Sequence, residues 1–227
     1  MPDTPDTPPC SVQDGAHCDA CTLNERINCR WDRCVLNGFI AVCWATYPGT
    51  LVLLGIVFLL TGWWWPIAAY TLYVVGIFLF EFRFLCSHCP YYAGEGRVLR
   101  CLANNGAPKI WRYNPAPMNG TERSLMLLLV WSLYVVIPLV AGLSAIWLVY
   151  AGGEGTVALL ATIGVVLLTL AASSTFLWIM KIYYCSRCIN FSCPLNTVDK
   201  QTVDAYLEKN PVMREAWEGS GYSLTRK

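Results

Sequence analysis

Pairs of cysteines separated by two residues are the part of this sequence that could do chemistry. Cys86 and Cys89 directly follow an apolar run, and Cys185 and Cys188 directly follow another. Two intervening residues allow a tight turn that aims both sulfurs at one ion, about 2.3 Å away for zinc. The chain has twelve cysteines in 227 residues, so the spacing indicates disulfides in an oxidising compartment or metal ligands in a reducing one.

Ten of the cysteines fall into three groups. The N-terminal group has the spacing C-x2-C-x7-C-x4-C, the central group C-x2-C-x11-C, and the C-terminal group C-x2-C-x4-C. The members, which we predict to be metal ligands, are Cys18, Cys21, Cys29 and Cys34; Cys86, Cys89 and Cys101; and Cys185, Cys188 and Cys193. We interpret the other two, Cys10 and Cys43, as small buried apolar side chains.

Zinc is the metal that we favour, and it needs four ligands. The N-terminal group can supply four. The other two groups supply three each, or pairs from both could share one four-thiolate site. An iron–sulfur cluster is the alternative, because Cys89 and Cys193 are each followed by proline, although the full cluster spacing is absent. Thiols without metal, or with a dithiol redox role, are the third interpretation. The two histidines, His17 and His88, each lie beside a cysteine and are weaker ligand candidates.

Four apolar segments must position these cysteines. Residues 39–80, 124–153 and 155–180 carry no charged side chain, and runs of about 18 or more apolar residues are typical of transmembrane helices. Pro48 predicts a break near the start of the first span, and Pro138 predicts a kink in the third. The predicted spans are Phe39 to Leu60, Trp63 or Pro66 to Leu85, Ser124 to Tyr150 and Thr156 to Tyr184.

The distribution of basic residues predicts the orientation. The short loops within the two pairs of spans hold one charge, Glu154, and all sixteen Lys and Arg residues lie on the other side. The positive-inside rule therefore places both termini and the central loop in the cytoplasm, in a multi-pass protein of the cytoplasmic (inner) cell membrane. Since the cytosol is reducing, we expect the cysteines on that face to bind metal rather than form disulfides.

The predicted fold class is an all-α integral membrane protein with four transmembrane helices as two tandem hairpins and a cysteine-rich, metal-binding cytoplasmic cap. Each hairpin ends in C-x2-C followed by a third cysteine, which indicates a repeat of two helices. In the C-terminal tail, Asp199 and Asn210 should begin two short helices that pack on the metal domain, lie on the membrane or dock a partner. The predicted segments are the Cys-rich N-terminus (1–38), hairpin one (39–85), the Cys-containing loop (86–123), hairpin two (124–184), and the Cys motif with its helical tail (185–227).

The spans offer little for chemistry within the membrane. They contain no histidine, and their ionisable residues are Glu81, Arg83 and Lys181, near the cytoplasmic end. Haem ligation, proton relays and voltage sensing need such groups inside the bilayer. We therefore predict a non-catalytic anchor or adaptor subunit in contact with the lipid bilayer and with other protein subunits at the cytoplasmic face, and without nucleic acid. The alternative is an iron–sulfur electron-transfer subunit of a membrane oxidoreductase. Lys181 is the expected partner of Glu81, which would otherwise be a proton-transfer candidate.

Overall fold

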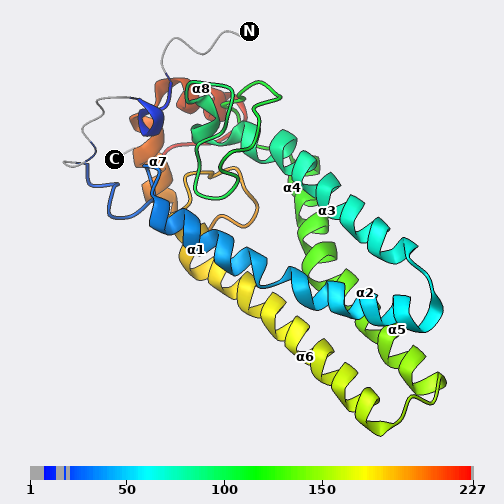
Figure 1. Ribbon diagram of the computed structural model, residues 1–227. Helices are drawn as coiled ribbons and strands as arrows, with labels where there is room; N and C mark the ends of the chain where they lie inside the picture. Colours follow the sequence, from blue (N-terminus) through cyan, green and yellow to red (C-terminus); the bar gives the residue numbers. More distant parts are fainter. Residues whose placement is uncertain (1–7, 14–17, 19–20, 226–227) are drawn as a thin grey trace. The chain divides into compact units, whose positions relative to one another are not determined.

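The computed structural model describes residues 8–13, 18 and 21–225, and its regular structure there is helical (Figure 1). Four stretches are long and apolar enough to cross a membrane, which confirms the prediction of a helical chain with four helices of membrane-spanning length and composition. Each continues past its predicted limits into more polar sequence. The four stretches are Arg33–Thr61, Trp65–His88, Gly120–Ala151 and Thr156–Arg187.

The first span is interrupted, as predicted, but the interruption precedes the proline. Helix α1 (Arg33–Trp44) ends before Thr46, and helix α2 (Tyr47–Thr61) begins with Pro48 in its first turn. Proline is tolerated there because the N–H that it lacks would have no partner within the helix. Helix α3 (Trp65–Phe84) forms most of the second span.

The third span changes its winding just ahead of Pro138. The missing N–H and the ring of a proline disrupt an α-helix at the carbonyl four residues earlier, here that of Tyr134. A wider π turn surrounds Tyr134 and accommodates the proline one turn later. The last two spans consist of α4 (Gly120–Trp131), the π segment Ser132–Val136, α5 (Ile137–Ala151), α6 (Thr156–Ile179) and a second π segment, Met180–Tyr184.

One of two compact units, which we call the membrane unit, comprises Ile40–Leu79 and Leu127–Ile179. In its core, α5 packs against both α2 and α6. The buried hydroxyls of Thr162 and Thr169 donate to carbonyl oxygens one turn back in α6, at 2.9 and 2.8 Å. The helix thus satisfies its own polar side chains, as a segment in lipid must.

Close approach of α2 to α6 depends on Gly49. A Cβ at this position would lie within 2.9 Å of Thr169 Cβ, whereas a Cβ at Gly55, also in α2, would meet no atom within 4 Å. We expect Gly49→Ala to destabilise the membrane unit by about 1–3 kcal/mol, as overpacking does. The matched variant Gly55→Ala should be neutral or slightly stabilising, since alanine is the better helix former. Thermal unfolding in detergent, followed by circular dichroism, compares the two, and equal midpoints would contradict the close packing.

The other compact unit, the cysteine-rich unit, joins three stretches that are far apart in sequence: Met1–Phe39, Phe80–Met126 and Met180–Lys227. Eleven of the twelve cysteines belong to it. In Figure 1 the blue N-terminal stretch and the orange-to-red C-terminal helices lie beside the green central loop. A compact unit cannot form from stretches on opposite sides of a bilayer, so four helices that all cross it would leave these three stretches on one side.

Two short helices of the tail pack into the cysteine-rich unit. Helix α7 (Lys200–Glu208) begins after Asp199, whose carboxylate accepts from Thr202 N at 2.9 Å, as predicted for an N-cap. Helix α8 (Pro211–Gly219) has no side-chain cap from Asn210. The apolar faces of both helices are buried in the same core as the cysteines, which agrees with packing on the domain. The buried residues on those faces include Val203, Tyr206, Leu207, Met213 and Trp217.

A buried carboxylate, Asp204, ties the chain after α8 to α7. It accepts hydrogen bonds from Lys200 Nζ (2.8 Å), the Tyr222 hydroxyl (2.7 Å) and Thr225 N (3.1 Å). Burial alone would raise its pKa, but these donors lower the pKa of Asp204 to about 2. The stabilisation is therefore complete above the unfolded-state pKa of about 3.9 and is lost as the pH falls towards 2.

We expect Asp204→Asn to destabilise the packing of the tail by about 2 kcal/mol, because the three donors lose a charged acceptor. Glu208→Gln, on the exposed side of the same helix, is the matched control and should have little effect. Limited proteolysis of the tail at neutral pH measures the difference. Equal cleavage rates for the two variants would show that the Asp204 contacts contribute nothing.

Candidate metal centre

The two C-x2-C motifs at the helix ends have the same backbone conformation. Residues Cys86–His88 and Cys185–Arg187 each form a single 3-10 turn directly after a helical span. Cys89 (φ −84°, ψ 134°) and Cys188 (φ −79°, ψ 130°) then begin extended backbone in nearly the same way. The repeat inferred from sequence therefore has a local structural counterpart at both cysteine pairs.

Asn190 links the turn at Cys185–Arg187 to the segment just before the turn at Cys86–His88. Its side-chain Nδ2 donates to Leu85 O, directly before Cys86, at 2.9 Å, and its backbone N donates to Cys188 Sγ at 3.4 Å. Cys188 consequently lies in electrostatic range of the three cysteines of the central stretch, and those three lie in range of one another. We call the four residues the central thiol group: Cys86, Cys89, Cys101 and Cys188.

Backbone N–H groups point at several of these sulfurs. Cys101 Sγ is approached by the N–H groups of Ala103 and Asn104, and Cys89 by that of Tyr91. Such donors favour a thiolate, which is the form that binds metal. Burial works in the opposite direction and raises the pKa of Cys101 to about 11. These residues fit a thiolate-bound cation, because a cation would supply the charge that burial otherwise disfavours.

A second set of four, the N-terminal thiol group, consists of Cys10, Cys18, Cys21 and Cys29. Cys18 and Cys21 are joined by a backbone hydrogen bond, in which Cys21 N donates to Cys18 O at 3.0 Å. Cys10 and Cys29 lie in electrostatic range of that pair and of each other. Burial, and then the charges of the other three thiols, raise the pKa of Cys29 to about 12.

Sequence reasoning did not assign Cys10 to this group. It is an isolated cysteine far from any C-x2-C pair, so spacing gave no signal. In the fold, Asn210 holds it in place: Cys10 N donates to Asn210 Oδ1 at 2.7 Å, and Asn210 Nδ2 contacts Cys10 Sγ at 3.4 Å. Cys34, the predicted fourth member, lies exposed in α1. Cys43 belongs to the membrane unit.

Three further candidates from the sequence are His17, His88 and Glu81. His17 lies outside the described residues. His88 is buried, with Nδ1 at 2.6 Å from Ala116 O and Nε2 at 3.7 Å from Glu122, so it faces these residues rather than the sulfurs. Glu81 accepts from Asn104 Nδ2 at 3.4 Å, and the expected ion pair with Lys181 does not occur among the described residues.

Each thiol group brings cysteines near one another, but among the described residues neither group forms a complete coordination shell for a metal ion. Across residues 8–13, 18 and 21–225, no three His, Cys, Asp or Glu side chains are arranged closely enough to hold one metal ion. The ten sequence-predicted ligands are distributed as follows: Cys18, Cys21 and Cys29 in the N-terminal group, Cys86, Cys89, Cys101 and Cys188 in the central group, Cys185 and Cys193 beside Cys188, and Cys34 apart.

One aromatic side chain, Tyr91, interacts with cysteines of both thiol groups. Its hydroxyl donates to Asn28 O at 2.9 Å, directly before Cys29. Burial raises the pKa of this phenol, and the charges of Cys89, Cys188, Cys29 and Cys101 act in the same direction. Cysteines of both groups therefore lie in electrostatic range of a single ring.

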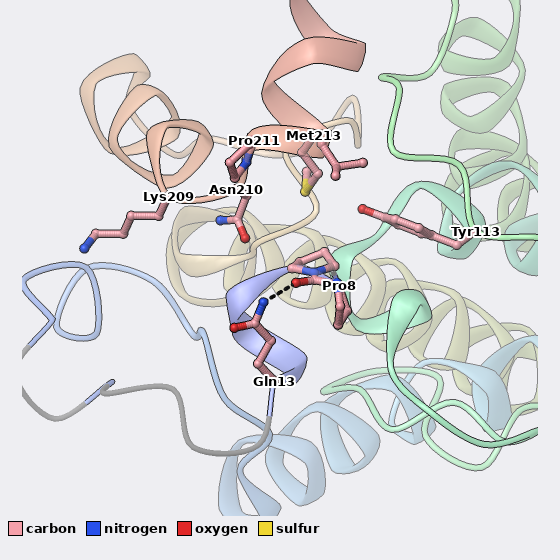
Figure 2. Close-up of a pocket in the computed structure, with 9 residues that line it drawn as sticks. Pro8, Gln13, Tyr113, Lys209, Asn210, Pro211 and Met213 are labelled. Atoms are coloured by element: carbon pink, nitrogen blue, oxygen red, sulfur yellow. Dashed lines mark hydrogen bonds between the residues drawn. The ribbon is translucent and has the colours of Figure 1, made fainter. Parts of the chain in front are cut away.

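A small hollow next to the N-terminal thiol group offers little room for a substrate. Figure 2 shows Pro8, Gln13, Tyr113 and Asn210 around it, with Gln13 Nε2 donating to Pro8 O at 2.6 Å. Its volume is about 30 Å³, which admits no more than a water or two. The hollow is thus a packing feature of the N-terminal stretch against the tail.

Fold and site together define a class: a multi-pass membrane protein with a compact, cysteine-rich unit. Comparison of the chain with protein-family models, with curated proteins and with solved structures found no match. The residues of the site therefore have to support any functional inference by themselves.

Proposed function

We propose that this chain is a membrane-anchored adaptor subunit whose cysteine-rich unit is held together by thiolate-bound metal, with zinc as the favoured ion. The observation that carries the proposal is the central thiol group. It brings Cys188, directly after the fourth span, into electrostatic range of the three cysteines that follow helix α3, two of which are buried in the core of the unit. A metal there would link the two halves of the chain.

A site with four protein thiolates is typical of structural metals, because a catalytic zinc keeps one position open for water or substrate. Burial also favours a structural site over a catalytic one, since Cys86 and Cys101 are 6% and 7% exposed. The membrane unit supports an anchoring role, because its two stretches contain no histidine and no Asp, Glu, Lys or Arg except Glu154, in the loop between α5 and α6. The proposal extends to other protein subunits, which the cysteine-rich unit would contact on the cytoplasmic side of the inner membrane.

Electron transfer through iron–sulfur clusters is the second candidate. The observation in its favour is Tyr91, whose phenol lies in electrostatic range of Cys29 in the N-terminal group and of Cys89, Cys101 and Cys188 in the central group. Two clusters at such positions would be close neighbours, as a chain of electron carriers requires. This candidate needs inorganic sulfide and iron in place of zinc.

Metal analysis of the full chain, purified anaerobically in detergent, tests the proposal. We expect a colourless protein that contains zinc, and Cys29→Ala and Cys89→Ala should each lower the zinc content. Cys43→Ala, outside the cysteine-rich unit, is the control and should leave it unchanged. A protein without bound metal would refute the proposal, and a brown protein with iron and acid-labile sulfide would favour electron transfer.

A further inference from the structure

We infer that the cysteine-rich unit holds a two-metal site in which the Cys188 sulfur bridges two thiophilic divalent cations. The inference rests on the proposed metal-binding function and specifies how one of its sites is built. The first ion would take the central thiol group. The second would take Cys185 and Cys193, together with the shared Cys188.

Cys188 lies where two sets of thiols meet. One set is the rest of the central thiol group, and the other consists of Cys185, in the same turn, and Cys193, in the following loop. Sequence spacing alone left two arrangements open, three ligands in each group or one shared site. A bridging Cys188 satisfies both arrangements, since a thiolate sulfur has lone pairs enough for two ions.

The loop after Cys188 is folded so that Cys193 returns to it. Cys193 N donates to Asn190 O at 3.2 Å, and Asn196 Nδ2 donates to Cys188 O at 2.7 Å. Thr197 N donates to Cys185 O at 3.2 Å, which closes the loop on the other side. Three thiols are thereby confined to one short loop, and Asn190 joins that loop to the segment before Cys86.

Glu81 completes the donor set of the second ion. It lies in electrostatic range of both Cys193 and Cys86. Asn104 Nδ2 is shared between Glu81 Oε2, at 3.4 Å, and Cys86 Sγ, at 3.3 Å, which places the carboxylate near the Cys86 sulfur. Three thiolates and one carboxylate are a normal tetrahedral set for zinc. A cation would also stabilise the charged form of this partly buried carboxylate, whose one hydrogen bond from Asn104 is long, at 3.4 Å.

Metal stoichiometry in a set of variants tests the bridge. We expect wild-type protein to bind three zinc ions, one at the N-terminal thiol group and two around Cys188. Cys185→Ala and Cys193→Ala should each lose one ion, whereas Cys188→Ala should lose two and keep the third. Cys34→Ala, an exposed cysteine, is the control and should lose none. Full metal content in Cys185→Ala and Cys193→Ala, or loss of one ion in Cys188→Ala, would overturn the bridge while leaving the proposed function intact.

A measurement on the wild type avoids dependence on variant folding. Cadmium replaces zinc in thiolate sites, and cadmium NMR of the substituted protein resolves each ion. We expect three resonances, two of which show mutual cadmium–cadmium coupling through the shared sulfur. Uncoupled resonances would overturn the bridge, and absence of any bound cadmium or zinc would instead refute the proposed function on which it rests.

Discussion

Removal of metal should unfold the cysteine-rich unit and leave the membrane unit folded. A structural zinc site contributes on the order of 10 kcal/mol, which is comparable to the whole stability of a small domain, about 5–15 kcal/mol. The buried core that contains Leu99 and Ile189 also contains Cys29, Cys86 and Cys101 of the thiol groups. We therefore expect this core to unfold when the ions are removed. The helices of the membrane unit share none of those residues.

Hydrogen exchange with mass spectrometry follows this effect at the level of peptides. After treatment with a strong chelator, amides in residues 86–113 and 185–208 should lose protection by several orders of magnitude, and amides in 137–179 should not. Adding zinc back should restore protection, and Cys34→Ala should respond as the wild type does. Unchanged protection of the cysteine-rich unit after complete metal removal would show that metal does not stabilise it.

The second large effect is an all-or-none difference in labelling across the membrane. The loop between α2 and α3 has no basic residue, whereas the central loop carries several, so the positive-inside rule places them on opposite sides. In intact bacterial cells, an impermeant maleimide should label Trp64→Cys and should label Glu95→Cys only after the cells are permeabilised. Both positions are exposed in the structure.

Wild-type protein is the baseline for this labelling, because its own cysteines, except Cys43, lie in the cysteine-rich unit. Labelling of Glu95→Cys without permeabilisation would place that unit outside the cell. Disulfides would then be the expected state of the cysteines, and the reason for preferring metal would be lost.

The spans could be predicted from sequence because their signal is local. A run of about 20 apolar residues without charge is sufficient, whatever surrounds it. The exact form of the interruption at Thr46 and of the π turn around Tyr134 could not be predicted from sequence, although Pro48 and Pro138 indicated both regions. Proline shows where a regular helix is difficult, but neighbouring residues decide how the chain accommodates it.

The candidate site was only partly predictable, because its composition is set by contacts distant in sequence. C-x2-C spacing identified Cys18, Cys21, Cys86 and Cys89 as pairs. The place of Cys10 depends on Asn210, which lies 200 residues away in the sequence. Likewise, the tie between Leu85 and Asn190 spans 105 residues. No spacing rule contains such contacts, so spacing gave no reason to place Cys10 near Cys18, Cys21 and Cys29.

X-ray absorption at the metal edge of the purified wild-type protein tests most directly whether thiolates hold a metal here. The spectrum reports the element present and the atoms of its first shell. We predict zinc with a shell dominated by sulfur at about 2.3 Å. A first shell of nitrogen and oxygen, or a protein with no metal to measure, would contradict thiolate ligation as the basis of the cysteine-rich unit.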